Sequence, residues 1–262
     1  MKYSFMTLVV FLTTFIISPN IACTSQESDH VQYADTIKIL SYNVRNCKGL
    51  DTITDYKRVG DIISRINADF VAIQELDSAT ERSHQVVVLN ELATQTKMFA
   101  TYRASINYQG GKYGIGILSK EKPINAEAIP LPGKEEKRSV LILEMAKYVI
   151  CCTHFSLTEA DRIASVDIVT KAVKKYSKPV FLAGDMNAKV GSTEMNNMVK
   201  DWLILNNPLQ PTIPANNPRA CIDFVLVKKS SEYQVKIIKS IVENEPLASD
   251  HLPVWVEVII NR

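Results

Sequence analysis

The segment from Pro179 to Val190, PVFLAGDMNAKV, places the strongest constraint on how this chain can fold. Four consecutive apolar residues, Val180 to Ala183, carry no polar group on either face, which is typical of a strand buried on both sides of a sheet. Gly184 then allows the chain to turn, and Asp185 and Asn187 follow. The segment predicts a buried strand that delivers a carboxylate and a carboxamide to one cleft. An ordinary turn would also use Asp and Asn, so the case for function depends on partners elsewhere in the chain.

The length and composition are those of one α/β domain. The chain has 262 residues, of which 46% are hydrophobic, enough to bury a large core. The 30 basic and 28 acidic residues leave a formal charge of +2, so the broad positive field used in non-specific nucleic-acid binding is absent. A nucleic-acid substrate is therefore not indicated by charge, and any polyanionic substrate must be held by local groups. No repeat or linker interrupts residues 36–262, and we expect a monomer.

The first 23 residues are typical of an export signal. Residues 1–22 carry one charged side chain, Lys2, followed by an apolar run that Ser18 and Pro19 interrupt. A transmembrane helix would need about 20 apolar residues, which the interrupted run does not supply. We therefore predict a signal peptide over residues 1–23 and an exported protein.

The end of this signal leaves two alternatives. Residues 20–23, NIAC, resemble a bacterial lipoprotein signal in which Cys23 becomes the lipidated first residue, although Asn20 stands where leucine is usual. Plain cleavage nearby is the other alternative. Residues 24–35 are polar and without periodicity, which predicts a tether between an anchor and the domain. The expected location is the periplasm or, for a lipoprotein, the outer membrane or cell surface, with membrane contact only through the anchor.

Apolar periodicity predicts alternating strands and helices after residue 36. A capping box of Thr158 and Asp161 is expected at the start of the third helix. Because strand pairs occur between the helices, the pattern favours a mixed sheet or two sheets over one parallel sheet. Strands are predicted over 37–43, 70–75, 99–106, 111–119, 140–144, 148–155, 180–183, 222–227, 235–242 and 254–260, and helices over 56–66, 83–97, 158–176 and 193–201.

The four cysteines of the domain are expected to be buried thiols. Four cysteines in a chain of this length do not form a disulfide scaffold. Cys151 and Cys152 are adjacent in a predicted strand, so their side chains point to opposite faces and do not readily share a metal ion. A zinc site is therefore not predicted.

Eight polar residues lie at the edges of strongly apolar segments, six of them at the end of a predicted strand. Strand ends form the ligand crevice of α/β sheets, so residues far apart in the sequence can converge there. Oxygen ligands without a thiolate suit a hard ion such as Mg²⁺ or Mn²⁺. Two members are histidines, which change charge near neutral pH. The eight residues are Asn43, Glu75, His154, Asp185, Asn187, Asp223, Asp250 and His251.

Six short motifs occur in the order found in the endonuclease/exonuclease/phosphatase superfamily, which the chain resembles over nearly all of residues 36–260. This resemblance implies a deoxyribonuclease I-like fold: a four-layer α/β sandwich in which two mixed sheets pack face to face with helices outside. It also implies that residues 36–262 form the catalytic domain. The motifs are SYNV at 41–44, QE at 74–75, THF at 153–155, GDMN at 184–187, IDFVLV at 222–227 and SDH at 249–251.

The resemblance implies catalytic roles for five residues. Asp185 would orient and deprotonate the attacking water, and Asn187 would hold that water or the phosphoryl oxygens. His251, kept in its tautomer by Asp223, would face the phosphate. His154 would steady a phosphoryl oxygen or protonate the leaving oxygen.

Four further residues are assigned by the same resemblance. Asn43 and Glu75 would form the metal site, with Glu75 as the principal ligand of Mg²⁺ or Mn²⁺, and Asp250 would serve that site from the other side. Arg138 resembles a basic residue near the cleft and would bind substrate together with Asn187. The alternative for Arg138 is a solvated charge at a strand end.

The implied reaction is hydrolysis of a phosphate ester by in-line attack of water, without a covalent intermediate. The sequence leaves the ester open between a phosphodiester, as in a nuclease, and the substrates of sphingomyelinase-like enzymes or inositol-phosphate phosphatases. A non-catalytic binding member of the same fold is the alternative from another class. The sequence argues against it, because no matched site residue is replaced.

Overall fold

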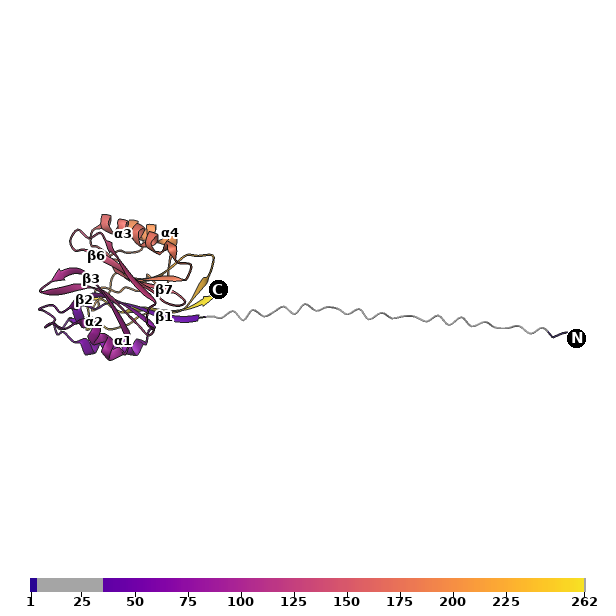
Figure 1. The fold of residues 1–262 in the computed structure, drawn as a ribbon, viewed down its shortest axis with the longest axis horizontal. Coiled ribbons are helices and arrows are strands. Elements are labelled where there is room, and N and C mark those ends of the chain that lie inside the picture. The colour runs from indigo at the N-terminus through magenta and orange to yellow at the C-terminus, as the bar shows by residue number, and fades with distance from the viewer. Residues whose placement is uncertain (4–34, 262) are drawn as a thin grey trace. The chain divides into compact units, whose positions relative to one another are not determined.

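The computed structural model describes residues 1–3 and 35–261, and the structural statements below concern these residues (Figure 1). The predicted signal peptide beyond residue 3, the lipidation site Cys23 and residues 24–34 of the tether lie outside them. Export and lipidation therefore stay predictions. Within the described part of the chain, no helix is long and apolar enough to cross a membrane.

Two six-stranded mixed sheets form the centre of the fold. The first has the strand order β11-β12-β1-β2-β4-β3 and the second β5-β6-β7-β8-β10-β9. The β1–β2 and β7–β8 pairs are parallel, and the other described pairs are antiparallel. The strands are β1 (Asp35–Asn43), β2 (Phe70–Ser78), β3 (Phe99–Tyr108), β4 (Gly111–Ser119), β5 (Asn125–Leu131), β6 (Arg138–Glu144), β7 (Val149–His154), β8 (Val180–Asp185), β9 (Trp202–Ile204), β10 (Asp223–Lys228), β11 (Gln234–Val242) and β12 (Val254–Asn261).

Helices cover the outer faces of both sheets, so the predicted four-layer sandwich is confirmed (Figure 1). One apolar cluster lies between the sheets, and two more lie under the helix layers. The helices α1 (Tyr56–Ile66) and α2 (Val88–Thr96) contact each other on one side, and α3 (Glu159–Ala172) and α4 (Thr193–Asp201) on the other. Two short 3₁₀ helices are η1 (Arg45–Cys47) and η2 (Val173–Lys175).

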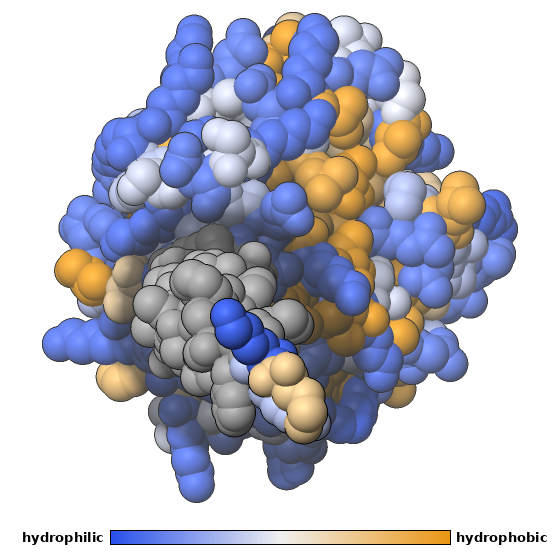
Figure 2. Space-filling view, turned by 90° about the vertical axis from the view of Figure 1, so that its right-hand side faces the viewer, coloured by the Kyte–Doolittle hydropathy of each residue, from blue (hydrophilic) through white to orange (hydrophobic). Residues whose placement is uncertain are grey.

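The two-residue period of the strands explains how one sheet contributes to two clusters. Ile37 and Ile39 belong to the cluster between the sheets, whereas Leu40 and Tyr42 belong to the cluster under a helix layer. Cys151 and Cys152 separate in the same way, and the four described cysteines are free and buried, as predicted. Most of the face in Figure 2 is hydrophilic, with hydrophobic residues gathered in one band.

The structure differs from the sequence prediction in two strands. The edge strand β5 was not predicted, because its residues do not alternate between buried and exposed and Leu131 at its end is the one that is fully buried. The three-residue β9 is too short to carry a periodic signal.

The helix predictions differ at their ends. The helix expected from residue 83 begins at Val88, because the Ser83 hydroxyl donates to the carbonyls of Thr80 and Val86 and supports a turn there. The capping box at the start of α3 is wrong, since Thr158 makes no capping bond. The carboxylate of Asp161 instead accepts hydrogen bonds from the backbone N–H of Lys134 and from Ser156.

Gly184 allows β7 and β8 to approach closely at the point where both deliver site residues. A Cβ at Gly184 would lie 2.1 Å from the carbonyl oxygen of Thr153, its partner in the parallel pair. We expect Gly184→Ala to lower the free energy of unfolding by about 1–3 kcal/mol, the usual cost of overpacking a core. Urea denaturation of both proteins measures this difference, and an unchanged midpoint would contradict the close approach.

Candidate active site

Both sheets bring polar residues to one edge of the sandwich. In the first sheet β1 ends there beside the irregular stretch of β2 that carries Glu75, before β2 itself ends at Ser78, and in the second sheet the parallel strands β7 and β8 end there. β10 runs antiparallel to β8 and begins at this edge, opposite the end of β8. A side-chain hydrogen bond of 3.1 Å from Asn43 to Asp185 connects the sheets, although these residues are 142 positions apart in the sequence. The sequence prediction that these strand ends converge is therefore confirmed for this pair.

The carboxylate of Asp185 occupies the centre of this edge. Its Oδ2 atom lies 3.5 Å from Nε2 of His154, 3.7 Å from Nε2 of His251 and 3.1 Å from the amide nitrogen of Asn43. Its Oδ1 atom accepts the backbone N–H of Asn187 at 2.9 Å, a local turn that fixes the carboxylate. Asp185 is 1% exposed, so these contacts act in a poorly solvated environment.

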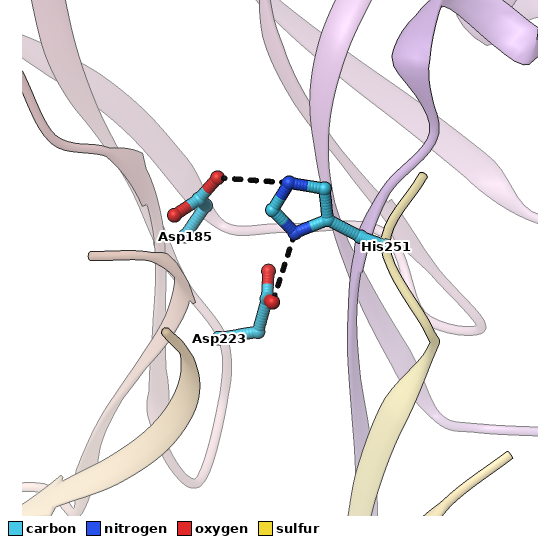
Figure 3. A group of neighbouring side chains, drawn as sticks. All are labelled: Asp185, Asp223 and His251. Atoms are coloured by element: carbon cyan, nitrogen blue, oxygen red, sulfur yellow. Dashed lines mark hydrogen bonds and ion pairs between the residues drawn. The ribbon is translucent and has the colours of Figure 1, made fainter. Parts of the chain in front are cut away.

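His251 connects this carboxylate to a second one (Figure 3). Its Nδ1 atom lies 2.9 Å from Oδ2 of Asp223, and the Thr212 hydroxyl donates to the same oxygen at 2.5 Å. Burial lowers the pKa of His251, but the charge and hydrogen bond of Asp223, with the charges of Asp185 and Asp250, outweigh it and raise the pKa to about 10. His251 is therefore an imidazolium at neutral pH, with its Nε2–H directed at Asp185.

His154, the second imidazole beside Asp185, favours the uncharged form. Burial lowers the pKa of His154, the charges of Arg138 and His251 add to this effect, and Asp185 offsets only part of it, so that the pKa is about 4. A neutral and a cationic imidazole thus flank one carboxylate. Titratable neighbours whose pKa values are driven apart are typical of acid–base sites.

The raised pKa of His251 can be tested by NMR, because the sequence has only four histidines. We expect one imidazole to stay protonated until the pH reaches about 10, and Asp223→Asn to lower that pKa. Since the folded value exceeds the ordinary value of 6.5, the stabilisation from this proton is fully present below pH 6.5 and is lost as the pH rises to about 10. An imidazole signal for His251 that titrates near 6.5 in the wild-type protein would refute this assignment.

Glu75 lies on the other side of Asn43. The Asn43 amide nitrogen donates to Glu75 at 2.9 Å as well as to Asp185, so one amide connects two carboxylates. Glu75 has a left-handed backbone (φ 61°), where the pairing of β2 with β4 is irregular. Burial raises the pKa of Glu75, and the charges of Asp250 and Asp185 raise it further, against the hydrogen bond from Asn43. Acidic groups gathered in this way would be stabilised by a cation.

Two groups of residues could hold that cation. Ligand atoms of Asp185, Asp223 and His251 all lie within 4.8 Å of one another. In this group the Asp223 oxygen that faces His251 also accepts from Thr212, whereas the buried Oδ1 atom of Asp223 has no hydrogen-bond partner among the described residues. Glu75 and Asp250 offer carboxylate oxygens, the ligands that a hard ion prefers.

Asn43 has a different orientation from the one a ligand would need. Its side-chain oxygen accepts the backbone N–H of Arg45 at 3.1 Å, and its nitrogen faces the carboxylates. The Ser249 hydroxyl donates to its backbone carbonyl at 2.7 Å and so connects β1 to the segment that carries Asp250 and His251. Asn43 therefore acts as a hydrogen-bond donor that holds the carboxylates of Glu75 and Asp185 next to each other.

The remaining predicted residues lie beside the same edge. The side-chain nitrogen of Asn187 donates to the carbonyl of Phe155 at 3.0 Å, which anchors it next to Asp185. Arg138 is 7% exposed and pairs with Glu136 at 3.0 Å, so it is not the solvated charge considered from the sequence. The side chain of Asp250 is more exposed than that of Arg138, and its Oδ2 atom lies 3.8 Å from Nε of Arg45.

Thr212 is a site residue that sequence reasoning missed. It lies in a proline-containing loop without periodicity, and its contact with Asp223 depends on how that loop folds back over β10. No local sequence signal distinguishes this threonine from the others in the chain.

Comparison with known proteins assigns the family and the fold. Residues 40–251 match the model of the Endonuclease/Exonuclease/phosphatase family. The chain belongs to this family. No curated protein matches the chain by sequence.

Solved structures of family members share the fold at low identity. A family protein from Bacteroides vulgatus is 15% identical with a TM-score of 0.71, covering 86% of this chain and 98% of its own. One from Beutenbergia cavernae is 18% identical with a TM-score of 0.70, covering 86% and 72%. A structure named mannosyl-6-phosphatase from Bacteroides thetaiotaomicron is 17% identical with a TM-score of 0.64, covering 85% and 99%. The deoxyribonuclease I-like architecture predicted from the sequence is thereby confirmed.

Proposed function

We propose that this family member is a divalent-metal-dependent hydrolase that cleaves a phosphate ester by in-line attack of water. The observation that carries the proposal is the position of the Asp185 carboxylate, 3.5 Å from the neutral His154 and 3.7 Å from the cationic His251. In this position the Asp185 carboxylate can accept a proton from water, while the protonated His251 remains beside it as a cationic hydrogen-bond donor.

Each side chain has a role that its contacts support. Asp185 accepts the proton of the attacking water, and the bond from the Asn187 N–H keeps its other oxygen in place. The Nε2–H of His251 donates to a phosphoryl oxygen, and Asp223 offsets the imidazolium charge. A low pKa favours His154 as a neutral hydrogen-bond donor that steadies a phosphoryl oxygen. As the bond from phosphorus to the leaving oxygen breaks, that oxygen takes a proton from solvent water, and Asp185 later returns its proton to solvent.

The metal site is proposed at Glu75 and Asp250, with Mg²⁺ or Mn²⁺ as the ion. A bound divalent cation would supply positive charge that offsets the charge developing on the phosphoryl group. Asn43 keeps the Glu75 and Asp185 carboxylates adjacent through its two hydrogen bonds. The buried Arg138 supplies a further positive charge near His154, in keeping with a role in substrate binding.

The test is a substrate panel with the purified protein. Bis(p-nitrophenyl) phosphate, plasmid DNA, sphingomyelin, inositol phosphates and a hexose 6-phosphate are each assayed with Mg²⁺ and with EDTA. The name of the Bacteroides thetaiotaomicron relative supports including the sugar phosphomonoester. We expect at least one compound to be hydrolysed with Mg²⁺ and none with EDTA.

Two results would contradict the proposal. Hydrolysis that persists in EDTA would rule out the metal requirement. No turnover of any compound would favour the non-catalytic alternative, in which the same residues only bind a phosphate group.

A further inference from the structure

A pocket lies beside the edge of the sandwich that carries the candidate active site, and no proposed catalytic step uses it. It has a volume of about 140 Å³ and is lined by Arg82, Ile106, Tyr108, Tyr113 and Glu136. A cavity of about 150 Å³ accommodates one benzene ring, so this pocket has room for a single six-membered ring.

Arg82 is held rigidly in the pocket wall. Its Nε and Nη2 atoms donate to the two carboxylate oxygens of Asp77 at 2.7 and 2.8 Å, and Asp77 is 1% exposed. Its guanidinium carbon lies 4.5 Å from the ring centre of Tyr108 and 5.4 Å from that of Tyr113. A hydrogen bond of 3.4 Å from Nη1 to the Tyr108 hydroxyl also holds the guanidinium plane, which leaves one N–H of Nη1 and one of Nη2 for a ligand.

The other polar groups of the pocket also have unused hydrogen-bonding capacity. One oxygen of the half-buried Glu136 accepts from Arg138 at 3.0 Å, and the other has no partner among the described residues. The Tyr113 hydroxyl likewise has no hydrogen-bond partner in the described part of the chain, and burial raises its pKa, so it is a neutral donor. The pocket thus offers a carboxylate acceptor, guanidinium donors and a hydroxyl around the apolar side chain of Ile106.

Residues of the pocket are neighbours of the proposed phosphate site in both sheets. Tyr113 pairs with Asp77 across β4 and β2, next to the irregular stretch of β2 that carries Glu75. On the second sheet, Glu136 contacts Arg138, whose charge acts on His154. A bond of 3.1 Å between the hydroxyls of Ser105 and Ser139 joins the two sheets near these residues. The leaving group of a phosphate bound at the catalytic edge could therefore extend into this pocket.

We propose that the pocket binds the hydroxylated six-membered ring of a hexose phosphate and selects it as the leaving group. This inference rests on the proposed hydrolase function. A carboxylate and a guanidinium on a half-apolar wall match adjacent hydroxyl groups on a ring that also has C–H faces. A planar nucleobase fits less well, because Arg82 covers the tyrosine faces and the two rings are inclined at 50° instead of forming a parallel slot.

The first experiment compares ring and chain substrates. The kcat/KM for glucose 6-phosphate and mannose 6-phosphate is measured against that for glycerol phosphate, a hydroxylated phosphomonoester without a ring. We expect a hexose preference of at least about 10-fold. Glu136→Gln should reduce this ratio by about 10- to 100-fold, the effect of losing a hydrogen bond that involves a charged group. Tyr113→Phe, which removes the free hydroxyl of the pocket, should reduce it by about 2- to 10-fold. The matched control is Glu127→Gln on β5, where the carboxylate binds Lys175 and Tyr176 instead.

A binding measurement separates this inference from the proposed function. Glucose 6-phosphate and inorganic phosphate are titrated into the Asp185→Asn protein with Mg²⁺ by calorimetry, with and without Glu136→Gln. Tighter binding of the hexose phosphate that Glu136→Gln abolishes would support the pocket even if no compound were hydrolysed. The pocket assignment would be overturned if the two ligands bound with equal affinity, or if Glu136→Gln weakened the binding of both equally. This holds even if the protein hydrolysed every compound of the panel. A stronger preference for inositol 1-phosphate than for either hexose phosphate would overturn the hexose assignment.

Discussion

Replacement of Asp185 by Asn is expected to lower kcat by about 10²- to 10⁴-fold, the usual contribution of a positioned general base. The amide keeps the size of the carboxylate, and its oxygen can still accept the Asn187 N–H that forms the local turn. It cannot take a proton from water, and it removes the negative charge between the two imidazoles. KM is expected to change much less than kcat, because the other groups that face the phosphate remain.

The control for Asp185→Asn is Asp167→Asn on the exposed face of α3, which removes the same charge far from any site contact. Steady-state kinetics on the best substrate of the panel measure both variants, and circular dichroism verifies that they fold. If Asp185→Asn retained wild-type kcat, the carboxylate would not be the base, and the mechanism proposed here would have to be abandoned.

Glu75→Gln is expected to weaken Mg²⁺ or Mn²⁺ binding by more than about 100-fold, because even residues that only orient metal ligands contribute 10- to 100-fold. Gln can still accept the hydrogen bond from Asn43, so the local structure should remain. Asp223→Asn is the matched comparison, since it removes a carboxylate from the other group that could surround an ion. We expect Asp223→Asn to lower kcat while leaving metal affinity within about 10-fold of wild type, because Asp223 acts through His251.

Calorimetric titration of the metal into each variant distinguishes the two sites without relying on turnover. Loss of binding in Asp223→Asn together with normal binding in Glu75→Gln would place the ion among Asp185, Asp223 and His251. In that case the proton on His251 could not persist in the metal-bound protein, and its role as a cationic donor would fail.

Much of the fold could be predicted from short-range patterns. The buried run before Gly184 and the alternation along β1 specify which faces are apolar, and the polar residues at strand ends mark where a crevice can form. These features depend on the two-residue period of a strand and on side-chain polarity, which are properties of neighbouring residues. The same patterns could not reveal β5 or β9, because β5 has one fully buried residue and no alternation, and β9 is three residues long.

The sequence alone determined the residue types available to the site and the order of the six family motifs. Only the tertiary structure decided the states of these residues: His251 is cationic beside two carboxylates, His154 is neutral through burial, and Asn43 presents its nitrogen to Glu75 and Asp185. The pairing of Arg82 with Asp77 and the pocket around it likewise appear only in three dimensions. The physical reason is that pKa values and hydrogen-bond partners depend on distances and burial set by contacts between distant segments, such as the one between positions 43 and 185.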